Sequence, residues 1–169
     1  MDDQLRRFAA RLYDESHAHD QARTDRLERF RNVEPPTAEL LGVLIRAVGA
    51  RGILELGTSN GYSTIWLADA ARATRGRVVS LDVDSARTEL ARETLRGVGL
   101  SEIVELRVGD ARDLLADSVE GEWEFIFLDA SARPTPAMWA TWFVSWRREG
   151  CWPSTTCCHT STSSSSSRR

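Results

Sequence analysis

The fold of this chain is decided by the stretch Ile53-Leu-Glu-Leu-Gly-Thr-Ser-Asn-Gly-Tyr-Ser-Thr64. Its first four residues form an apolar run that carries one acid, which predicts a buried strand. Gly57 and Gly61 then predict a sharp turn, and the hydroxyl residues around them predict the start of a helix. A glycine turn between a strand and a helix leaves room for a ligand to lie against backbone N–H groups.

The same alternation of strand and helix continues along the chain. Strands are predicted at residues 52–56, 77–81, 103–108 and 125–128, and helices at residues 62–74, 85–97 and 111–118. Before them, apolar residues at helical spacing predict a helix from Leu5 to Tyr13, and Thr37 is predicted to cap a helix that reaches Val48. Apolar strands that alternate with helices indicate an α/β fold, an open parallel sheet with helices on both faces.

Each predicted strand ends in a pattern suited to holding a ligand. The first ends in the glycine turn, and the second ends in Asp82, 21 positions after Gly61. That spacing suits a carboxylate that accepts hydrogen bonds from both hydroxyls of a ribose. Gly109-Asp-Ala111 follows the third strand, placed to frame an adenine, and Asp129 ends the fourth. Because parallel strands end at one edge of the sheet, the four patterns predict a single site for a nucleoside-containing cofactor.

Each pattern also has an explanation that needs no ligand. A glycine after a strand is most often only a turn, Asp82 could cap the helix from Ser85, and Asp129 could be a solvated strand end. An NAD-dependent oxidoreductase is a further alternative. The glycine spacing is G-x-x-x-G rather than G-x-G-x-x-G, so the pyrophosphate cradle is missing and a cofactor without phosphates is favoured.

Residues 37–129 resemble the small catechol/caffeoyl-CoA group of class I S-adenosylmethionine-dependent O-methyltransferases. The resemblance is carried by Leu54-Glu-Leu-Gly-Thr-x-x-Gly-Tyr-Ser-Thr64, Val79-x-x-Asp82-x-Asp84, Val108-Gly-Asp-Ala111 and Phe125-Ile-Phe-Leu-Asp-Ala130. It implies a Rossmann-like fold and the transfer of a methyl group from S-adenosylmethionine to a hydroxyl oxygen of a small molecule, with a phenol as one option. The alternative function is a truncated remnant that binds S-adenosylmethionine without turnover.

The resemblance also implies a role for each candidate residue. The methionine portion of the cofactor is assigned to Glu55, Gly57, Thr58 and Ser63, with Gly61 in the same turn. The ribose is assigned to Asp82, and the adenine edge to Asp110 with Ala111. Asp129 matches an acid that ligates a divalent cation in relatives, so Mg²⁺ is an optional second cofactor. No catalytic residue is assigned, because the lysine base of relatives is replaced here by Arg133, whose guanidinium stays protonated.

The C-terminal strands of the family are missing or garbled in this sequence. Relatives continue with a Pro-Gly-Gly turn, a fifth strand and an Asp-Asn pair that completes the metal site. Regrouping the codons of residues 147–159 one base upstream permits Ala-Pro-Gly-Gly-Val-Leu-Ala-Val-Asp-Asn-Val-Leu-Ser-His, which contains those features in order. We therefore hypothesise a shift of reading frame between Ala130 and Met138. With the tail as written, the strand at residues 125–128 is expected to be an exposed edge.

Composition and charge restrict the remaining options. A hydrophobic content of 41% and a net charge of −3 are typical of a soluble globular protein. With no basic cluster and no apolar span, we expect a cytoplasmic protein with a small-molecule hydroxyl acceptor and no nucleic-acid or membrane partner. Three segments are predicted: an N-terminal helical segment (1–36), a cofactor-binding core (37–136) and an aberrant, disordered tail (137–169). Homodimer formation stays open.

Overall fold

The computed structural model of the chain describes residues 1–119, 121–129 and 143–144. The elements in chain order are α1 (Asp3–Gln21), the 3₁₀ helix η1 (Arg26–Glu28), α2 (Pro35–Val48), β1 (Gly52–Leu56), α3 (Tyr62–Thr74), β2 (Arg77–Asp82), α4 (Ser85–Gly97), β3 (Val104–Val108), α5 (Ala111–Asp117), β4 (Phe125–Leu128) and β5 (Phe143–Val144). Apart from residues 143–144, the segment predicted to be a disordered tail lies outside the described residues, so that prediction is untested.

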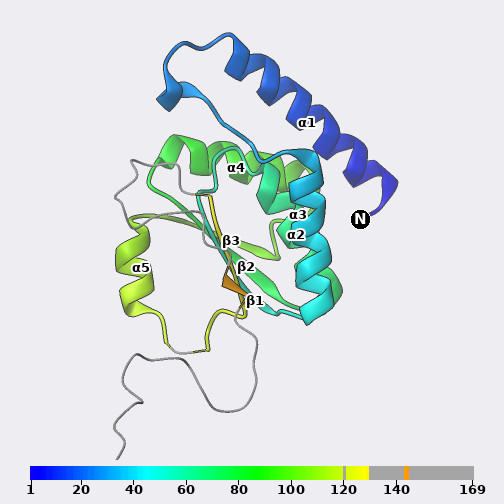
Figure 1. Cartoon of the computed structure of the whole chain (residues 1–169), viewed down its shortest axis with the longest axis vertical. Helices are drawn as coiled ribbons and strands as arrows, with labels where there is room; N and C mark the ends of the chain where they lie inside the picture. The colour runs from blue at the N-terminus through cyan, green and yellow to red at the C-terminus, as the bar shows by residue number, and fades with distance from the viewer. Residues whose placement is uncertain (120, 130–142, 145–169) are drawn as a thin grey trace, which may run out of the picture.

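The strands form one sheet in the order β3-β2-β1-β4-β5 (Figure 1). The first four are parallel, and Ile53 of β1 pairs with Val78 of β2 on one side and with Phe125 of β4 on the other. The predicted parallel sheet is therefore confirmed. β5 pairs antiparallel with β4, so the prediction that β4 is an exposed edge is wrong over these two residue pairs.

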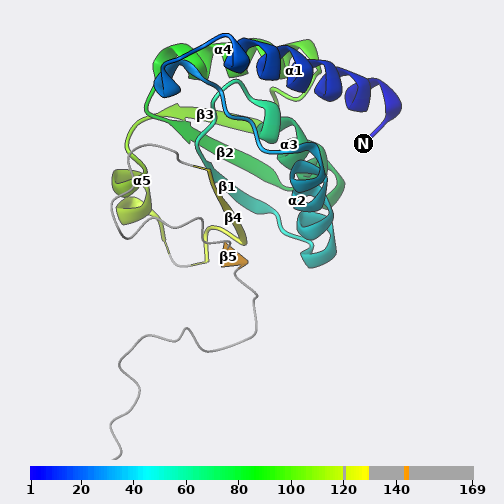
Figure 2. The ribbon, with the colours of Figure 1, turned by 45° about the horizontal axis from the view of Figure 1, so that its top comes forward.

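Helices cover both faces of the sheet, as predicted. Figures 1 and 2 show α2, α3 and α4 on one face, with α1 across them, and α5 on the other face. Side chains alternate between the faces along each strand, so Ile53 and Val78 join the larger apolar cluster and Leu54 and Val79 join the smaller one. Two separate apolar layers thus hold the sheet between its helices.

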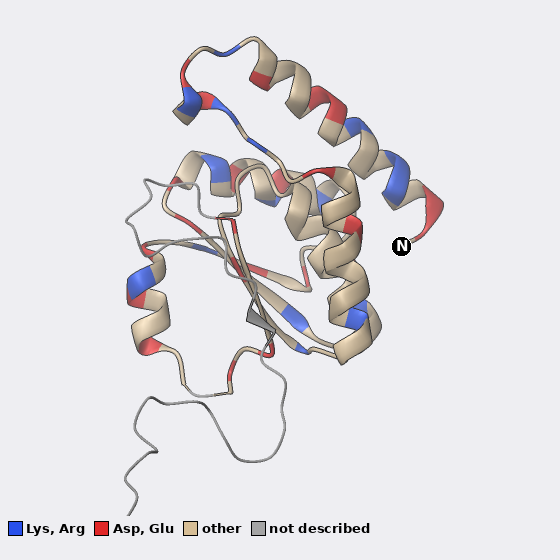
Figure 3. Cartoon of the chain, in the orientation of Figure 1, with Lys and Arg blue, Asp and Glu red and all other residues tan. Residues whose placement is uncertain are grey.

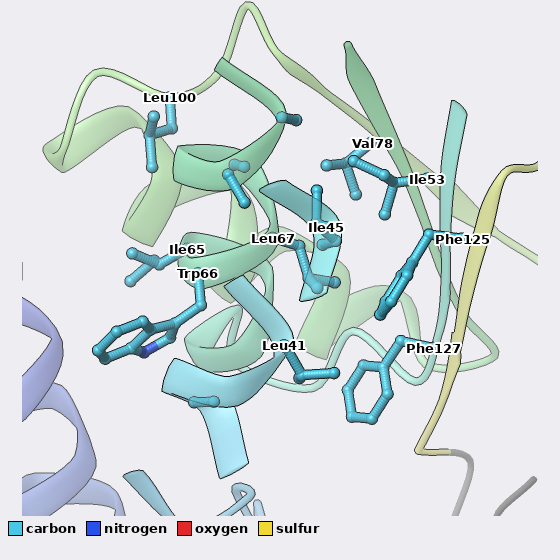
Figure 4. Close-up of a cluster of buried hydrophobic side chains, with 14 of the residues drawn as sticks. Leu41, Ile45, Ile53, Ile65, Trp66, Leu67, Val78, Leu100, Phe125 and Phe127 are labelled. Carbon is cyan, nitrogen blue, oxygen red and sulfur yellow. The ribbon is translucent and has the colours of Figure 1, made fainter. Parts of the chain in front are cut away.

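The larger layer is built mainly from α2, α3 and the strands. Figure 4 shows Leu41 and Ile45 of α2 facing the sheet side chains Phe125 and Phe127. Leu41, Ile45 and Phe125 are fully buried. Truncating such a side chain to alanine typically costs about 2–5 kcal/mol, so this layer fixes the direction of β1 and β4 and hence the place where both end.

α1 packs on this layer through the residues that its sequence spacing predicts. Leu5 and Ala9 are buried, and Phe8 and Leu12 pack against the cluster. An ion-pair cluster adds to the attachment, because the carboxylate of buried Asp69 in α3 binds the amino group of Met1 (3.1 Å) and the side chains of α2 and α3, Arg46 and Arg72.

The helix starts follow the local sequence with one exception. Asp84 caps α4 by accepting the N–H groups of Ala86 and Arg87, and Asp110 caps α5 through the N–H of Arg112. The prediction that Thr37 caps the second helix is wrong. α2 begins at Pro35, whose fixed backbone angle suits the first helical turn, and its N-cap residue, Glu34, makes no side-chain hydrogen bond to the start of the helix.

Two surface properties of the described part bear on partners. Acidic and basic residues are interleaved along the elements rather than gathered on one face (Figure 3). Within the described ranges, none of the helices combines the length and the apolar character needed to span a bilayer.

Candidate functional site

The carboxyl ends of β1 and β4 lie side by side at the point where the chain changes direction across the sheet. β1 is followed by a helix on one face, whereas β4 is reached through α5 on the other face (Figure 1). In open parallel sheets, this switch point opens a crevice beyond the strand ends, where ligands bind. The four predicted ligand-holding patterns all lie at this edge, because all four strands run the same way.

The turn between β1 and α3 is held in a conformation that favours glycine. Gly57 (φ 111°) and Gly61 (φ 85°) both have positive φ, as does Ser59 between them (φ 50°). The N–H of Gly57 donates to the carbonyl of Leu81 in β2 at 2.8 Å, so the turn is fixed to the neighbouring strand. The turn is therefore a rigid platform at the start of α3.

Glu55 lies beneath this turn and is fully buried. Its carboxylate accepts hydrogen bonds from the hydroxyls of Ser63 (2.5 Å), Thr64 (2.5 Å) and Ser80 (2.6 Å). Thr58 joins the same network through a 2.6 Å contact with Ser80. Burial raises the pKa of Glu55 to about 7, and the three donors act against that rise.

The residues predicted to bind the methionine portion of the cofactor thus lie close together, but several of their side chains form hydrogen bonds within the same network. The contacts of Glu55, Thr58 and Ser63 support a role in holding β1, β2 and α3 together beneath the turn. Their assignment to the cofactor stays a prediction, since these side chains are almost wholly buried. The backbone of the turn, rather than the Glu55 carboxylate, is the surface that the edge presents.

Asp82 joins the two loops that flank this edge. Its carboxylate accepts the N–H of Ser59 at 2.8 Å and the N–H of Asp84 at 3.0 Å. The alternative explanation that Asp82 caps α4 is wrong, because Asp84 is the capping residue. A carboxylate oxygen accepts more than one hydrogen bond, so Asp82 keeps acceptor capacity for a ligand hydroxyl.

The segment after β3 forms the wall of a hollow beside α5. It has a volume of about 370 Å³, whereas a separate hollow beside α1 has a volume of about 420 Å³. This smaller hollow is lined by Leu81, Gly109 and Asp110 among others. It is the relevant one, because it adjoins the strand ends. An ion pair with Arg112 (2.7 Å) lowers the pKa of Asp110 to about 2.

Asp129 continues β4 at the switch point, where its N–H donates to the carbonyl of Leu56 at 2.9 Å. Burial raises the pKa of its carboxyl to about 6, and the charge of Arg31 opposes that rise. Asp129 is half-buried, unlike a fully solvated strand end. Within the described residues, no group of three or more His, Cys, Asp or Glu side chains is arranged to hold a metal ion.

The comparison with protein families agrees with the arrangement of residues at this edge of the sheet. A model of the family described as O-methyltransferase matches residues 19–144, about three quarters of the chain. The chain belongs to the O-methyltransferase family. The matched range contains all the strands and every predicted site residue of this family member.

Individual relatives give the same result. A catechol O-methyltransferase of Mycobacterium tuberculosis is 36% identical over 118 residues, covering 70% of this chain and 53% of that protein. The structure of TomG from Streptomyces achromogenes with SAM has 32% identity and a TM-score of 0.59, covering 77% and 54%. A Bacillus cereus O-methyltransferase with SAH has 33% identity and a TM-score of 0.58, covering 77% and 55%. This family member spans about half the length of the relatives it matches.

The loop between α1 and α2, residues 22–34, is the part of the site that the sequence did not predict. The hydroxyl of Ser59 donates to the carbonyl of Phe30 (3.1 Å), so the loop touches the glycine turn. Arg87 at the start of α4 donates to the carbonyls of Leu27 (2.5 Å) and Arg29 (3.0 Å). The sequence places this loop in the N-terminal helical segment, whereas the structure has only the short η1 between α1 and α2. The backbone carbonyls that make these contacts leave no signal in the sequence.

Proposed function

We propose that this chain binds S-adenosylmethionine at the carboxyl edge of the sheet and transfers its methyl group to a hydroxyl oxygen of a small molecule. The proposal is carried by the link between Asp82 and the N–H of Ser59 at 2.8 Å. This hydrogen bond places a carboxylate of the kind that binds ribose hydroxyls beside a turn whose backbone N–H groups can face a ligand. The relatives solved with SAM and SAH support the choice of cofactor.

In this proposal each group has a separate task. The backbone of the turn at Gly57–Gly61 faces the amino-acid part of the cofactor, and Asp82 accepts hydrogen bonds from the ribose. Gly109 and Ala111 bound the adenine side. The acceptor oxygen attacks the methyl carbon in line with the breaking carbon–sulfur bond, and the sulfonium becomes a neutral thioether. An ionised acceptor oxygen would react faster than a neutral hydroxyl, because its negative charge is attracted to the sulfonium and both products are then neutral.

A phenolic acceptor is proposed from the names of two relatives, catechol O-methyltransferases from Mycobacterium tuberculosis and Niastella koreensis. The Mg²⁺ that was expected at Asp129 does not fit the described residues alone. They offer one carboxylate there, no cluster of metal ligands, and a guanidinium whose charge acts on that carboxylate. We therefore assign no step of the transfer to a metal ion, and the metal dependence is left to experiment.

Titration calorimetry with S-adenosylhomocysteine tests cofactor binding. We expect saturable binding by the chain and binding at least about tenfold weaker for Asp82→Asn, because hydrogen bonds to a charged group contribute about 1.5–3 kcal/mol. Glu39→Gln on the exposed side of α2 is the matched control and should bind normally. Absence of binding by the unaltered chain would overturn the proposal, and binding of NADH instead would favour an oxidoreductase.

Transfer of radiolabelled methyl to catechol tests the chemistry. It is measured with added Mg²⁺ and, in parallel, with a chelator. Transfer under either condition supports the proposal, and the ratio of the two rates gives the metal dependence. Cofactor binding without any transfer would instead support a remnant that binds S-adenosylmethionine without turnover.

A further inference from the structure

Arg31 is held at the edge of the sheet by an unusual backbone arrangement. The carboxylate of Asp20, near the end of α1, accepts the N–H groups of Phe30 (2.8 Å) and Arg31 (2.7 Å). This clamp holds Arg31 at φ 54°, in the left-handed region that residues other than glycine seldom adopt. Such a conformation costs about 1–3 kcal/mol and persists where its surroundings enforce it.

The two residues that precede Arg31 are fixed to two elements of the site. The carbonyl of Phe30 is bound by Ser59 of the glycine turn, and the carbonyl of Arg29 is bound by Arg87 of α4. The direction in which the Arg31 side chain leaves the backbone is therefore set by the same turn and helix that shape the site. Figure 2 shows the loop between α1 and α2 passing beside the turn that follows β1.

The side chain of Arg31 is partly buried, and its Nε lacks a partner in the part of the chain that the structure describes. Its Nε is shielded from water and, among the described residues, makes no hydrogen bond. Burial lowers the pKa of its guanidinium, and the negative charge of Asp129 opposes this effect. Buried polar groups in proteins nearly always have a hydrogen-bond partner, so a cation left unpaired at a site points to a ligand.

The carboxylate of Asp129 is also a partly buried charged group without an ion-pair partner among the described residues. No ion pair within 4.0 Å joins its carboxylate to Arg31 or to any other group in the described ranges, although each charge acts on the other. Direct pairing would satisfy both charges at once. In the described part of the chain, the lack of such a pair leaves an unpaired carboxylate at the end of β4 and a fork of N–H donors in the loop before α2.

We propose that Arg31 is a specificity-determining residue whose guanidinium binds an anionic oxygen of the methyl acceptor, while Asp129 accepts a hydrogen bond from the neighbouring hydroxyl. The ligand class is an aromatic ring with adjacent oxygens, one ionised and one protonated. This inference rests on the proposed function and deepens it. It also gives the acceptor oxygen a positively charged partner in a chain that lacks the lysine that relatives carry after the fourth strand.

The transfer step balances with these groups. The acceptor hydroxyl loses its proton to water, because a guanidinium is not a base at neutral pH. The resulting oxyanion, held by Arg31, forms the new oxygen–carbon bond. The carbon–sulfur bond breaks, its electron pair stays on sulfur, and the products are the methyl ether and S-adenosylhomocysteine.

The test uses 4-nitrocatechol, whose ionised form absorbs visible light, with the full chain saturated with S-adenosylhomocysteine and a chelator present. We expect the unaltered chain to bind the ionised ligand and to lower the pH at which the bound ligand ionises. Arg31→Met should weaken this binding about tenfold and raise that ionisation pH by about one unit, since each unit corresponds to 1.36 kcal/mol. Arg31→Lys should restore part of both effects.

The controls separate the possible outcomes. Arg23→Met removes the same charge from the same loop at an exposed position and should leave binding of 4-nitrocatechol unchanged. Affinity for S-adenosylhomocysteine should be the same in all variants. A loss of S-adenosylhomocysteine affinity in Arg31→Met would overturn the inference by assigning the guanidinium to the cofactor carboxylate. Unchanged 4-nitrocatechol binding in Arg31→Met, or none in the unaltered chain, would overturn it while the proposed function stands.

Discussion

The carboxylate of Glu55 is surrounded by three hydroxyl donors, and burial nevertheless raises its pKa to about 7. Its ordinary pKa is 4.5, so between pH 4.5 and 7 the folded chain binds a proton that the unfolded chain has released. Stability attributable to this group is present at low pH and falls as the pH rises to 7. A shift of this size corresponds to about 3 kcal/mol.

Glu55→Gln should remove this pH dependence, because an amide does not ionise. We expect the free energy of unfolding of the variant, minus that of the unaltered chain, to increase by about 3 kcal/mol between pH 4.5 and pH 8, because only the unaltered chain loses stability over this range. Urea denaturation at several pH values measures it. Glu105→Gln is the control, since the bond to Arg107 lowers the pKa of that exposed carboxyl and predicts a small effect of opposite sign. A constant difference across the pH range would contradict the assignment.

At the scale of elements, the turn after β1 brings α3 and α4 close together. A β-carbon added to Gly61 would lie 3.2 Å from the β-carbon of Ala91 in α4 and 3.3 Å from its α-carbon. Gly61 therefore satisfies two requirements, a positive φ and a close approach between helices. The second requirement links the packing of α4 to the shape of the turn after β1, where the cofactor is proposed to bind.

Gly61→Ala should lower the free energy of unfolding by about 2–4 kcal/mol, which combines the left-handed backbone with the contact to Ala91. Gly99→Ala has a similar φ of 69° but nothing within 4 Å, so it should cost only about 1–2 kcal/mol. Thermal and urea unfolding measure both variants. S-adenosylhomocysteine binding should fall for Gly61→Ala alone, and an equal loss of stability in the two variants would show that the contact with α4 has no effect.

Prediction from sequence succeeded where a pattern repeats over a whole element. The bounds predicted for β1, α3 and α4 agree with the structure because apolar runs and capping residues are local signals. The direction of a side chain at a strand end is not local. Glu55 turns into the core because Ser80 comes from the next strand, and Arg31 reaches the edge because Asp20 clamps it from α1.

At the scale of the molecule, the described sheet carries the residues assigned to the proposed cofactor half of the site. The turn, Asp82 and the loop before α2 all precede residue 100 and are joined by hydrogen bonds. β4 has its neighbour β1 on one side, and only two residue pairs with β5 on the other. Cofactor binding is thus expected to depend little on the residues after β4, whereas a metal site at Asp129 depends on ligands from beyond it.

The proposed shift of reading frame makes this difference measurable. A chain re-encoded in the upstream frame from residue 130 onward would regain a Pro-Gly-Gly turn and an Asp-Asn pair. Because carboxylate and amide oxygens are suitable Mg²⁺ ligands, we expect the re-encoded chain to bind Mg²⁺ by calorimetry and the present chain to bind it much more weakly. Affinity for S-adenosylhomocysteine should change little. Asp129→Asn in the re-encoded chain should weaken Mg²⁺ binding, and equal Mg²⁺ binding by both chains, or an uninterrupted frame in the coding DNA, would contradict the hypothesis.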